Sequence, residues 1–385
     1  MEATFKHFDL GLIEPDFNSD FMNVILELNH LRRQRLYGST KPWLFFQLKE
    51  IFHLLESVGS ARIEGNRTTV SEYIEQKIEK SETPSERFTE ISNVEKAMTF
   101  IDENMSKGAD ITTHFIRELH RITVNDLDKE GDKTPGNYRS WGVKIAQSSH
   151  IPPDPITVKN YMDELLNFIN TDHGKQYDLI KVALAHHRFA WVHPFGNGNG
   201  RVVRLMTYVL LIKYGFKVSE EQLLNPTAVF CNNRDTYYKM LSIADQGDKP
   251  SLLTWCEYVL TGIRDEIIKV NKLLDHDYLF NKILKPSVLL ANERGLIDKS
   301  ELEVLKMGLQ LQEFKASDVS KALPDLTDRQ RTHLIQKLRI NQMIEPLKEN
   351  GRTYGVVFYN NYLMRSLITF LEKEGFIPEY YENNS

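Results

Sequence analysis

At 385 residues, with 41% apolar and 26% charged side chains, the chain has the composition of an ordinary globular protein with room for two or three domains. Its net charge of −5 argues against a protein that coats nucleic acid, but it allows a local basic face. The two cysteines, Cys231 and Cys256, exclude a disulfide framework and a CxxC metal site, so we expect a reducing, cytoplasmic setting. We read neither a signal peptide nor a membrane span, because apolar runs of the required length are missing.

Helical periodicity dominates the first 130 residues. Apolar residues recur at helical spacing over about 20–31, 43–58, 86–105 and 111–122. Between the second and third of these segments, Glu64 stands just before a Gly-Asn pair that ends a helix or turn. Taken alone, Glu64 is most simply a solvated carboxylate of that turn.

The pattern changes after Gly131. Thr134–Asn137 has the residues of a turn, and Tyr138–Ile145 alternates like a short strand. Residues 147–150 then predict a hairpin turn, followed by an extended, proline-rich exit over 151–155. The simplest reading is an ordinary surface hairpin, although it comes just before the most informative part of the chain.

That part is the nine-residue stretch His193–Arg201, HPFGNGNGR, between apolar helices expected at 179–192 and 199–214. Pro194 disfavours the helical conformation at His193, so the first helix should end there. The glycines permit a tight turn and leave backbone amides uncovered at the start of the next helix. A glycine-rich turn that enters a helix is a ready site for an anion such as phosphate.

The charged residues of this stretch strengthen the interpretation. Arg201 and Arg204 lie in the first turn of the second helix, where the helix dipole disfavours cations unless an anion or a carboxylate answers them. His193, beside such a phosphate site, is a candidate general base for a transfer reaction. The alternative, a helix-capping turn with a core histidine, gives no reason for the two arginines.

The last third of the chain has a different pattern. Beyond helices at about 232–245 and 251–278, we expect helices over 297–311, 316–323 and 327–343, and strands over 344–348 and 353–359 joined by an Asn-Gly turn. This order is typical of a winged helix-turn-helix domain. Its third helix carries the basic residues Arg329, Arg331, Lys337 and Arg339. They suit phosphate contacts in a DNA groove, but a module for packing or protein contact fits equally well.

The stretch His193–Arg204 resembles the Fic-family signature, HPFx[D/E]GNGRxxR. The likeness extends to Pro135–Arg139 and Ile151–Pro153, which resemble the family's flap, and to Tyr237-Tyr238, which resemble its paired tyrosines. Ser60–Gly65 resembles the inhibitory motif [ST]xxxE[GN] of family members in which that motif precedes the core.

The resemblance implies an all-α Fic fold with a short β-hairpin flap, and the pattern of the last third adds a C-terminal α+β winged helix-turn-helix domain. It divides the chain into an N-terminal helical segment with the inhibitory motif (1–85), a catalytic core (86–275) and a winged-helix domain (276–375). Members of the family mostly transfer AMP from ATP to a hydroxyl group of a target protein.

On that resemblance His193 is the catalytic base, and Glu64 is inhibitory through an ion pair with Arg204. The flap would bind the target by strand addition through Gln147, Ser148, Ser149 and His150. Contacts to ATP and its phosphates are implied for Phe195, Asn197, Gly198, Asn199, Gly200, Arg201, Arg204, Tyr237 and Asp245. Mg²⁺ is the implied cofactor, with Asn197 at the position of its protein ligand.

Two residues depart from the family's pattern. Asn197 stands where an Asp or Glu usually holds Mg²⁺, and an amide oxygen brings no charge to a hard cation. Asp245 stands where some relatives have an adenine-binding Asn, and a carboxylate cannot donate a hydrogen bond. The open alternatives are removal of AMP from modified proteins, transfer of another phosphate-containing group, and a DNA-binding regulator with a vestigial nucleotide site. The sequence leaves the target and the oligomeric state open, a homodimer included.

Overall fold

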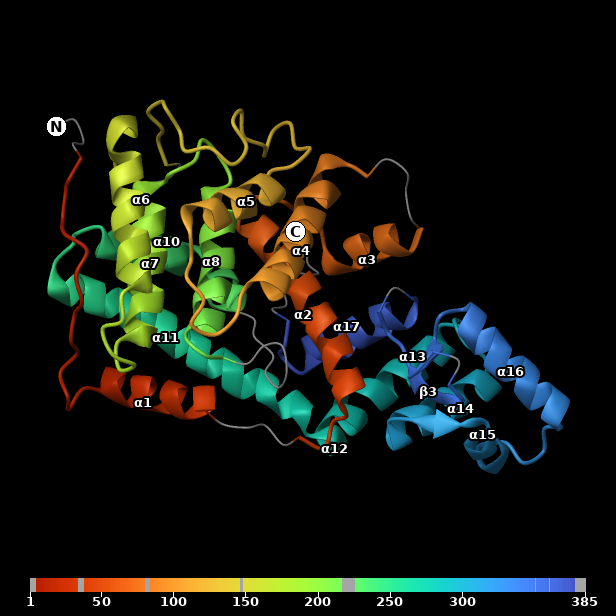
Figure 1. Ribbon diagram of the computed structural model, residues 1–385. Helices are drawn as coiled ribbons and strands as arrows, with labels where there is room; N and C mark the ends of the chain where they lie inside the picture. Colours follow the sequence, from red (N-terminus) through yellow and green to blue (C-terminus); the bar gives the residue numbers. More distant parts are fainter. Residues whose placement is uncertain are drawn as a thin grey trace. The chain divides into compact units, whose positions relative to one another are not determined.

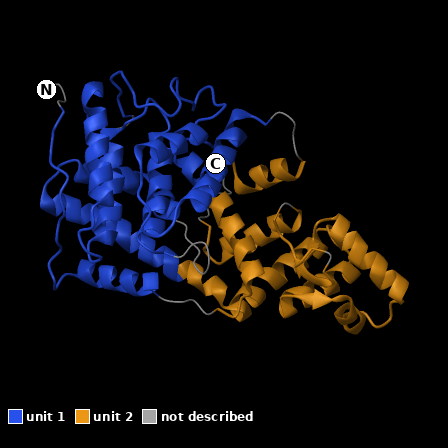
Figure 2. Cartoon of the chain, viewed as in Figure 1, with its two compact units in different colours: residues 1–35, 56–67, 84–268 blue, residues 36–55, 68–83, 269–385 orange. Residues whose placement is uncertain are grey.

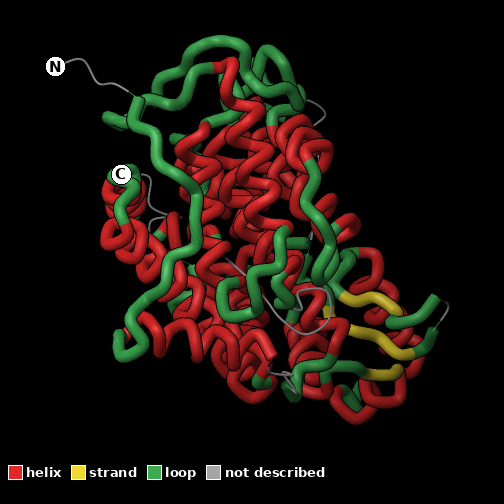
Figure 3. The backbone as a smooth tube through the Cα atoms, turned by 60° about the vertical axis from the view of Figure 1, so that its left-hand side comes forward, coloured by secondary structure: helices red, strands yellow, loops and turns green. Residues whose placement is uncertain are grey.

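The computed structural model describes residues 5–33, 38–79, 84–145, 148–216, 226–349, 351–359 and 361–377. The described chain is mainly helical, with one small sheet (Figure 3). It divides into two compact units (Figure 2). Unit 1 holds residues 1–35, 56–67 and 84–268, and unit 2 holds 36–55, 68–83 and 269–385. No helix in the described ranges is both long and apolar enough to cross a membrane.

Unit 1 is built from helices alone among its described residues (Figure 1). They are α1 (Asp20–Arg33), the end of α2 (Pro42–Ile63), α4 (Glu86–Asn104), α5 (Thr113–Thr123), α6 (Pro155–Asn170), α7 (Asp178–Val192), α8 (Asn199–Lys213), α9 (Thr227–Cys231), α10 (Arg234–Ala244) and most of α11 (Lys249–Asn271). Helices α7 and α8 form its centre, where α6 packs on α7, and α4 and α5 pack on α8.

The two central helices are buried along nearly their whole length, as their apolar sequences predict. Helix α7 ends where Pro194 requires it to end, because His193 adopts a left-handed conformation with φ 50°. Helix α8 starts from Gly198, which is also left-handed with φ 75° and suits a residue without Cβ. The signature loop therefore lies at the ends of two core helices.

The predicted strand over 138–145 is wrong, because neither 138–145 nor 148–154 forms a strand. Arg139 accounts for the difference. Its buried guanidinium donates to the carbonyls of Trp141, Pro153, Val192 and His193, and its own N–H donates to Pro194 O. Two carbonyls of this segment and the Arg139 N–H are thus bound to a side chain or to the loop, so they do not pair two strands of a hairpin.

Unit 2 contains the small sheet. Its elements are the first part of α2, α3 (Val70–Glu79), η1 (Lys272–Leu274), α12 (His276–Leu279), η2 (Phe280–Leu284), α13 (Lys285–Glu293), α14 (Lys299–Leu311), β1 (Phe314–Lys315), α15 (Ala316–Ala322), α16 (Asp328–Ile340), β2 (Ile344–Pro346), β3 (Thr353–Val356) and α17 (Leu363–Lys373). The strands are antiparallel in the order β1-β3-β2. The predicted helix over 251–278 instead ends at Asn271, and Asp275 caps a new helix.

Candidate active site

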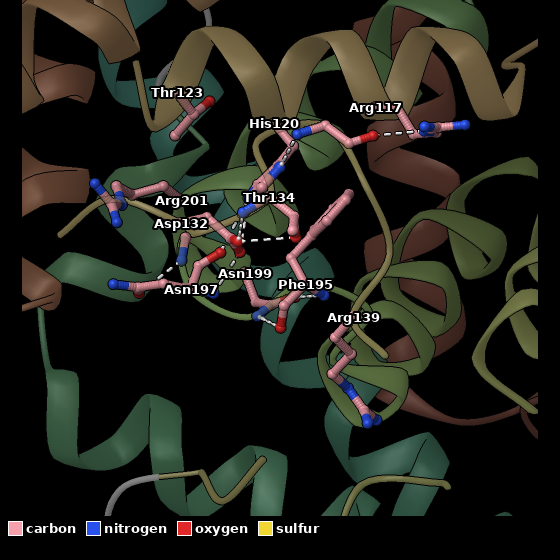
Figure 4. A network of polar contacts seen from close by, with 12 residues as sticks. Arg117, His120, Thr123, Asp132, Thr134, Arg139, Phe195, Asn197, Asn199 and Arg201 are labelled. Atoms are coloured by element: carbon pink, nitrogen blue, oxygen red, sulfur yellow. Dashed lines mark hydrogen bonds and ion pairs between the residues drawn. The ribbon is translucent and has the colours of Figure 1, made fainter. Parts of the chain in front are cut away.

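The loop between α7 and α8 is held in shape by its own side chains (Figure 4). The amide of Asn199 bonds Phe195 twice: its oxygen accepts from the Phe195 N–H at 2.9 Å, and its nitrogen donates to the Phe195 carbonyl at 2.9 Å. Asn199, which is buried at the start of α8, thus fixes the conformation of the loop. Phe195 is buried as well and lies parallel to the ring of His120 at 3.7 Å between centroids.

His193 has the tautomer and the charge state of a base. Its Nδ1 lies 3.4 Å from the carbonyl oxygen of Ala190, which can only accept, so Nδ1 carries the proton and Nε2 is left as an acceptor. Desolvation by the surrounding protein lowers the pKa of His193 to about 4. The imidazole is therefore neutral at neutral pH and able to take up a proton.

The first turn of α8 offers backbone amides to an anion. The first intrahelical bond runs from Val202 N to Gly198 O, so the amides before Val202 have no acceptor within the helix. The N–H of Gly198 donates to Asn197 Oδ1 at 2.7 Å. We expected the amides of Gly198, Asn199 and Gly200 to bind phosphate. The amides of Asn199 and Gly200 lie at the helix start, whereas that of Gly198 already donates to the Asn197 side chain.

Glu64 occupies the space in front of this helix start. Its Oε1 accepts from Arg204 Nη2 at 2.6 Å, and a Cβ added to Gly200 would lie only 2.0 Å from the same oxygen. Ser60 holds Arg204 as well, since its hydroxyl and carbonyl oxygens accept from the guanidinium at 2.9 Å each. Burial alone would raise the pKa of Glu64, but Arg204, and then Arg201, hold it below its usual value. The carboxylate is thus charged beside the helix start.

Arg201 has a different partner. It is fully buried, lies 3.1 Å from the Glu90 carboxylate on α4, and donates to the Glu130 carbonyl at 2.7 Å. The Nε and Nη1 atoms of Arg201 are buried and make no hydrogen bond to the described residues, so its phosphate contact stays a prediction. Sequence analysis missed Glu90, although its spacing from Val94 on the apolar face of α4 was a usable signal.

The paired tyrosines of α10 differ in exposure. Tyr237 is buried and its hydroxyl bonds His186 Nε2 at 2.9 Å, whereas Tyr238 is half-buried and stacks on Tyr237. Tyr238 is therefore the more accessible of the two to a nucleobase. Asp245, at the end of α10, lies 2.9 Å from His187 Nε2, so its carboxylate already has a partner in α7.

Part of the predicted flap is described. Gln147 lies outside the described residues, and Ser148 and Ser149 are exposed. His150 is turned towards α7, where its ring stacks on Trp191 and its Nε2 lies 2.8 Å from the Trp191 carbonyl. Among the described residues of this segment, the two serines are the ones open to a partner.

The described residues do not provide a ready Mg²⁺ site. They contain no group of three or more His, Cys, Asp or Glu side chains that could hold a metal ion. The predicted ligand oxygen, Asn197 Oδ1, already accepts from Gly198 N–H, and the nearby Asp132 carboxylate accepts from Asn197 N–H at 2.9 Å. The residues present thus do not fit a resident Mg²⁺, and the prediction of this cofactor stays a prediction.

Comparison with known proteins places this site in context. Residues 110–211 match the model of the Fic/DOC family. Two curated relatives, both named protein adenylyltransferase Fic, come from Drosophila virilis and Drosophila melanogaster. Each is 29% identical, over 62% and 60% of this chain respectively. The chain spans less than half of either relative, 44% and 43%.

Solved structures show the same fold. A Fic family protein from Desulfovibrio desulfuricans G20 has a TM-score of 0.55 at 17% identity, covering 91% of this chain and 98% of its own. A Fic domain containing signaling protein from Bacteroides thetaiotaomicron has a TM-score of 0.53 at 18% identity, covering 66% of this chain and 97% of its own. At these identities the likeness shows the fold alone.

Proposed function

Because residues 110–211 match the model of the Fic/DOC family, we propose that the chain is a nucleotidyltransferase that moves AMP from ATP to a Ser, Thr or Tyr hydroxyl of a protein. The observation that carries the proposal is a neutral imidazole, His193, one loop away from the uncovered amides of a buried helix start. The relatives named protein adenylyltransferase Fic support the choice of reaction.

In the proposed reaction the acceptor hydroxyl attacks the α-phosphorus of ATP. The new bond joins the hydroxyl oxygen to this phosphorus, the bond to the β-phosphate oxygen breaks, and pyrophosphate leaves. His193 Nε2 takes the hydroxyl proton, since Nδ1 is bound to Ala190 O. The amides of Asn199 and Gly200, with the positive end of the α8 dipole, stabilise the negative charge that develops on the phosphates.

We further propose that Glu64 inhibits this reaction in the manner of an N-terminal inhibitory motif. Its carboxylate lies where phosphate oxygens would meet the start of α8, and it binds Arg204 at 2.6 Å. A phosphate group in this space would clash with the Glu64 carboxylate and would be repelled by its negative charge. ATP in the productive position therefore requires Glu64 to move away.

The test is transfer of label from α-labelled ATP. We expect Glu64→Gly to raise modification of itself or of lysate proteins about tenfold or more over wild type, which corresponds to about 1.4 kcal/mol. Glu64→Gln keeps the side-chain volume and removes the charge, so it should give an intermediate rate. His193→Ala in the Glu64→Gly background is the blank, with an expected loss of about 10²–10⁴-fold. An unchanged or lower rate in Glu64→Gly contradicts the inhibition, and no transfer from ATP, GTP, UTP or CTP contradicts the function.

Removal of AMP is the alternative that uses the same residues. The Glu64 side chain is 28% exposed and so retains a face on which a water could be placed. Incubation of wild type with AMP-modified protein distinguishes the reactions: release that is lost in Glu64→Gly supports removal, and label gained by Glu64→Gly supports transfer.

For the second unit we propose a winged helix that recruits a partner, with DNA as the second candidate function. The order α14-β1-α15-α16-β2-β3 supports this. The basic residues of α16 divide into two pairs: Arg331 donates to the carbonyls at the end of α15, and Lys337 pairs with Asp298 and Glu301, whereas Arg329 and Arg339 are exposed. DNA affinity that falls with salt and depends on the exposed pair would favour the regulator.

A further inference from the structure

The backbone of Asn197 is held from two sides by buried side chains outside the signature loop (Figure 4). Asp132 Oδ2 accepts from the Asn197 N–H at 2.9 Å, and His120 Nε2 lies 3.1 Å from the Asn197 carbonyl oxygen. Both side chains have no exposed area. We propose that Asp132 and His120 are positioning residues for the phosphates of the nucleotide, because they fix the two peptide groups on either side of Asn197, just before α8 starts. This inference rests on the proposed function.

The hydrogen bonds of His120 fix its proton. The N–H of Gly136 lies 2.9 Å from His120 Nδ1, and a backbone N–H can only donate, so Nδ1 is the acceptor. The single proton of the neutral ring is therefore on Nε2, which donates to Asn197 O. His120 thus acts as a donor with a set direction.

Both carboxylate oxygens of Asp132 accept hydrogen bonds. Its Oδ1 accepts from the N–H of Thr134 at 2.8 Å and from the Thr134 hydroxyl at 3.3 Å, while its Oδ2 accepts from Asn197. The carboxylate is thus fixed in its own turn and reaches the loop with the remaining oxygen. It does not replace the metal-holding acid that the signature lacks at Asn197, because its oxygens are directed at donors and are buried.

The two held peptide groups directly precede the start of the helix. Asn197 is followed by Gly198, whose left-handed conformation begins α8. On the other side, a Cβ at Gly196 would lie 2.6 Å from the ring of Trp141 and 3.0 Å from Asp132, so the loop passes both residues closely. Rotation of the Asn197–Gly198 peptide, or of the one before it, would turn Gly198 and with it the first amides of α8. A displacement of about 1 Å in such a site costs about 10²-fold in rate.

The experiment compares three substitutions in the Glu64→Gly background. Asp132→Asn loses an acceptor and should lower kcat about 10–100-fold, and it should raise the KM for ATP, because ATP uses the same phosphate site. The amide nitrogen of His120→Gln can donate near the former Nε2, so this variant should retain most of kcat. The shorter His120→Asn side chain can replace only the acceptor that faces Gly136. Its kcat should therefore fall by as much as that of Asp132→Asn. Asp128→Asn, an exposed acid of the same segment, is the matched control.

Each result has a defined meaning. Unchanged kcat in folded Asp132→Asn, or equal rates for the two His120 variants, would overturn the assignment. So would a large increase in the Mg²⁺ concentration needed by Asp132→Asn, because that result identifies a metal ligand. A loss explained by unfolding is recognised by thermal melting of each variant.

A binding measurement separates this inference from the proposed reaction. If the Glu64→Gly protein transfers no nucleotide, the reaction proposal fails, but the phosphate site is still tested by calorimetry with adenosine and ADP. Asp132→Asn should weaken ADP binding about tenfold, or about 1.4 kcal/mol, and leave adenosine binding nearly unchanged. Equal losses for both ligands, or no ADP binding by the parent protein, would refute the positioning role. Amide hydrogen exchange at Asn197, slow in the parent and fast in Asp132→Asn, is the accompanying structural readout.

Discussion

The low pKa of His193 makes a quantitative prediction about the pH dependence of transfer. The active form is the neutral imidazole, and a lowered pKa extends this form to lower pH. At pH 5.5 a histidine with an ordinary pKa of about 6.5 is only about 9% neutral, whereas one with a pKa of about 4 is about 97% neutral. Transfer by the Glu64→Gly variant should therefore be nearly the same at pH 5.5 and pH 7.5, where an ordinary histidine would lose about tenfold. The charge of Glu64 raises the pKa of His193. Removing Glu64 therefore lowers this pKa further and shifts the fall in activity to still lower pH.

The assay is single-turnover transfer from labelled ATP to one acceptor between pH 4.5 and 8. ATP binding is measured at each pH, so that ionisation of the nucleotide is separated from that of the enzyme. Far-UV circular dichroism identifies the range in which the protein stays folded. An acid limb with a midpoint near 6.5 in folded, ATP-saturated protein would refute the reasoning, because it would show that burial does not desolvate His193.

Three further predictions concern the metal, acid stability and the second unit. Asn197→Asp adds a carboxylate at the signature's metal position and should lower the Mg²⁺ concentration for half-maximal transfer in the Glu64→Gly background; an unchanged Mg²⁺ titration would contradict it. The lowered pKa of buried His120 means that part of the free energy of unfolding is lost as the pH falls from about 6.5 towards 4, on the order of 1 kcal/mol of it by pH 5.5. Denaturant titrations at pH 7.5 and 5.5 should show a smaller drop in the free energy of unfolding for His120→Gln than for wild type. Equal drops in the two proteins would contradict the assignment of this loss to His120. If unit 2 binds DNA, reversing Arg329 and Arg339 to Glu should reduce the salt slope by about 2, measured by fluorescence anisotropy; wild-type protein that binds no DNA in this assay rules that function out.

The parts of the fold that sequence predicted well are those determined locally. Pro194 and the glycines lie next to one another in the chain, and the ends of α7 and α8 follow from the backbone preferences of these residues. The strands β2 and β3 were also predicted, because an Asn-Gly pair separates two apolar runs. β1 was missed, since two residues are too short to show an alternating pattern.

The missed contacts join residues that are far apart in sequence. Alternation predicted a strand at 138–145, but Arg139 binds carbonyls of the loop more than 50 residues later, and no local pattern reveals such a partner. The same holds for Asp132, which reaches Asn197 across 65 residues. The pairing of Glu64 with Arg204 was expected only through the family resemblance, because residue spacing alone favoured a solvated carboxylate at Glu64.

Glu64 and Asp132 act on the same helix start through different atoms, and this leads to a last prediction. Glu64 is partly exposed and binds Arg204 in front of Gly200, whereas Asp132 is fully buried and binds the backbone behind Gly198. Since the two carboxylates share no hydrogen-bond partner, Asp132→Asn should weaken ADP binding by the same factor in wild type and in the Glu64→Gly background, within about 0.5 kcal/mol. Calorimetry on the four proteins of this cycle gives the coupling directly. A much larger loss in one background would mean that both carboxylates hold the loop together, and Glu64 would then be part of the scaffold of the site instead of its removable block.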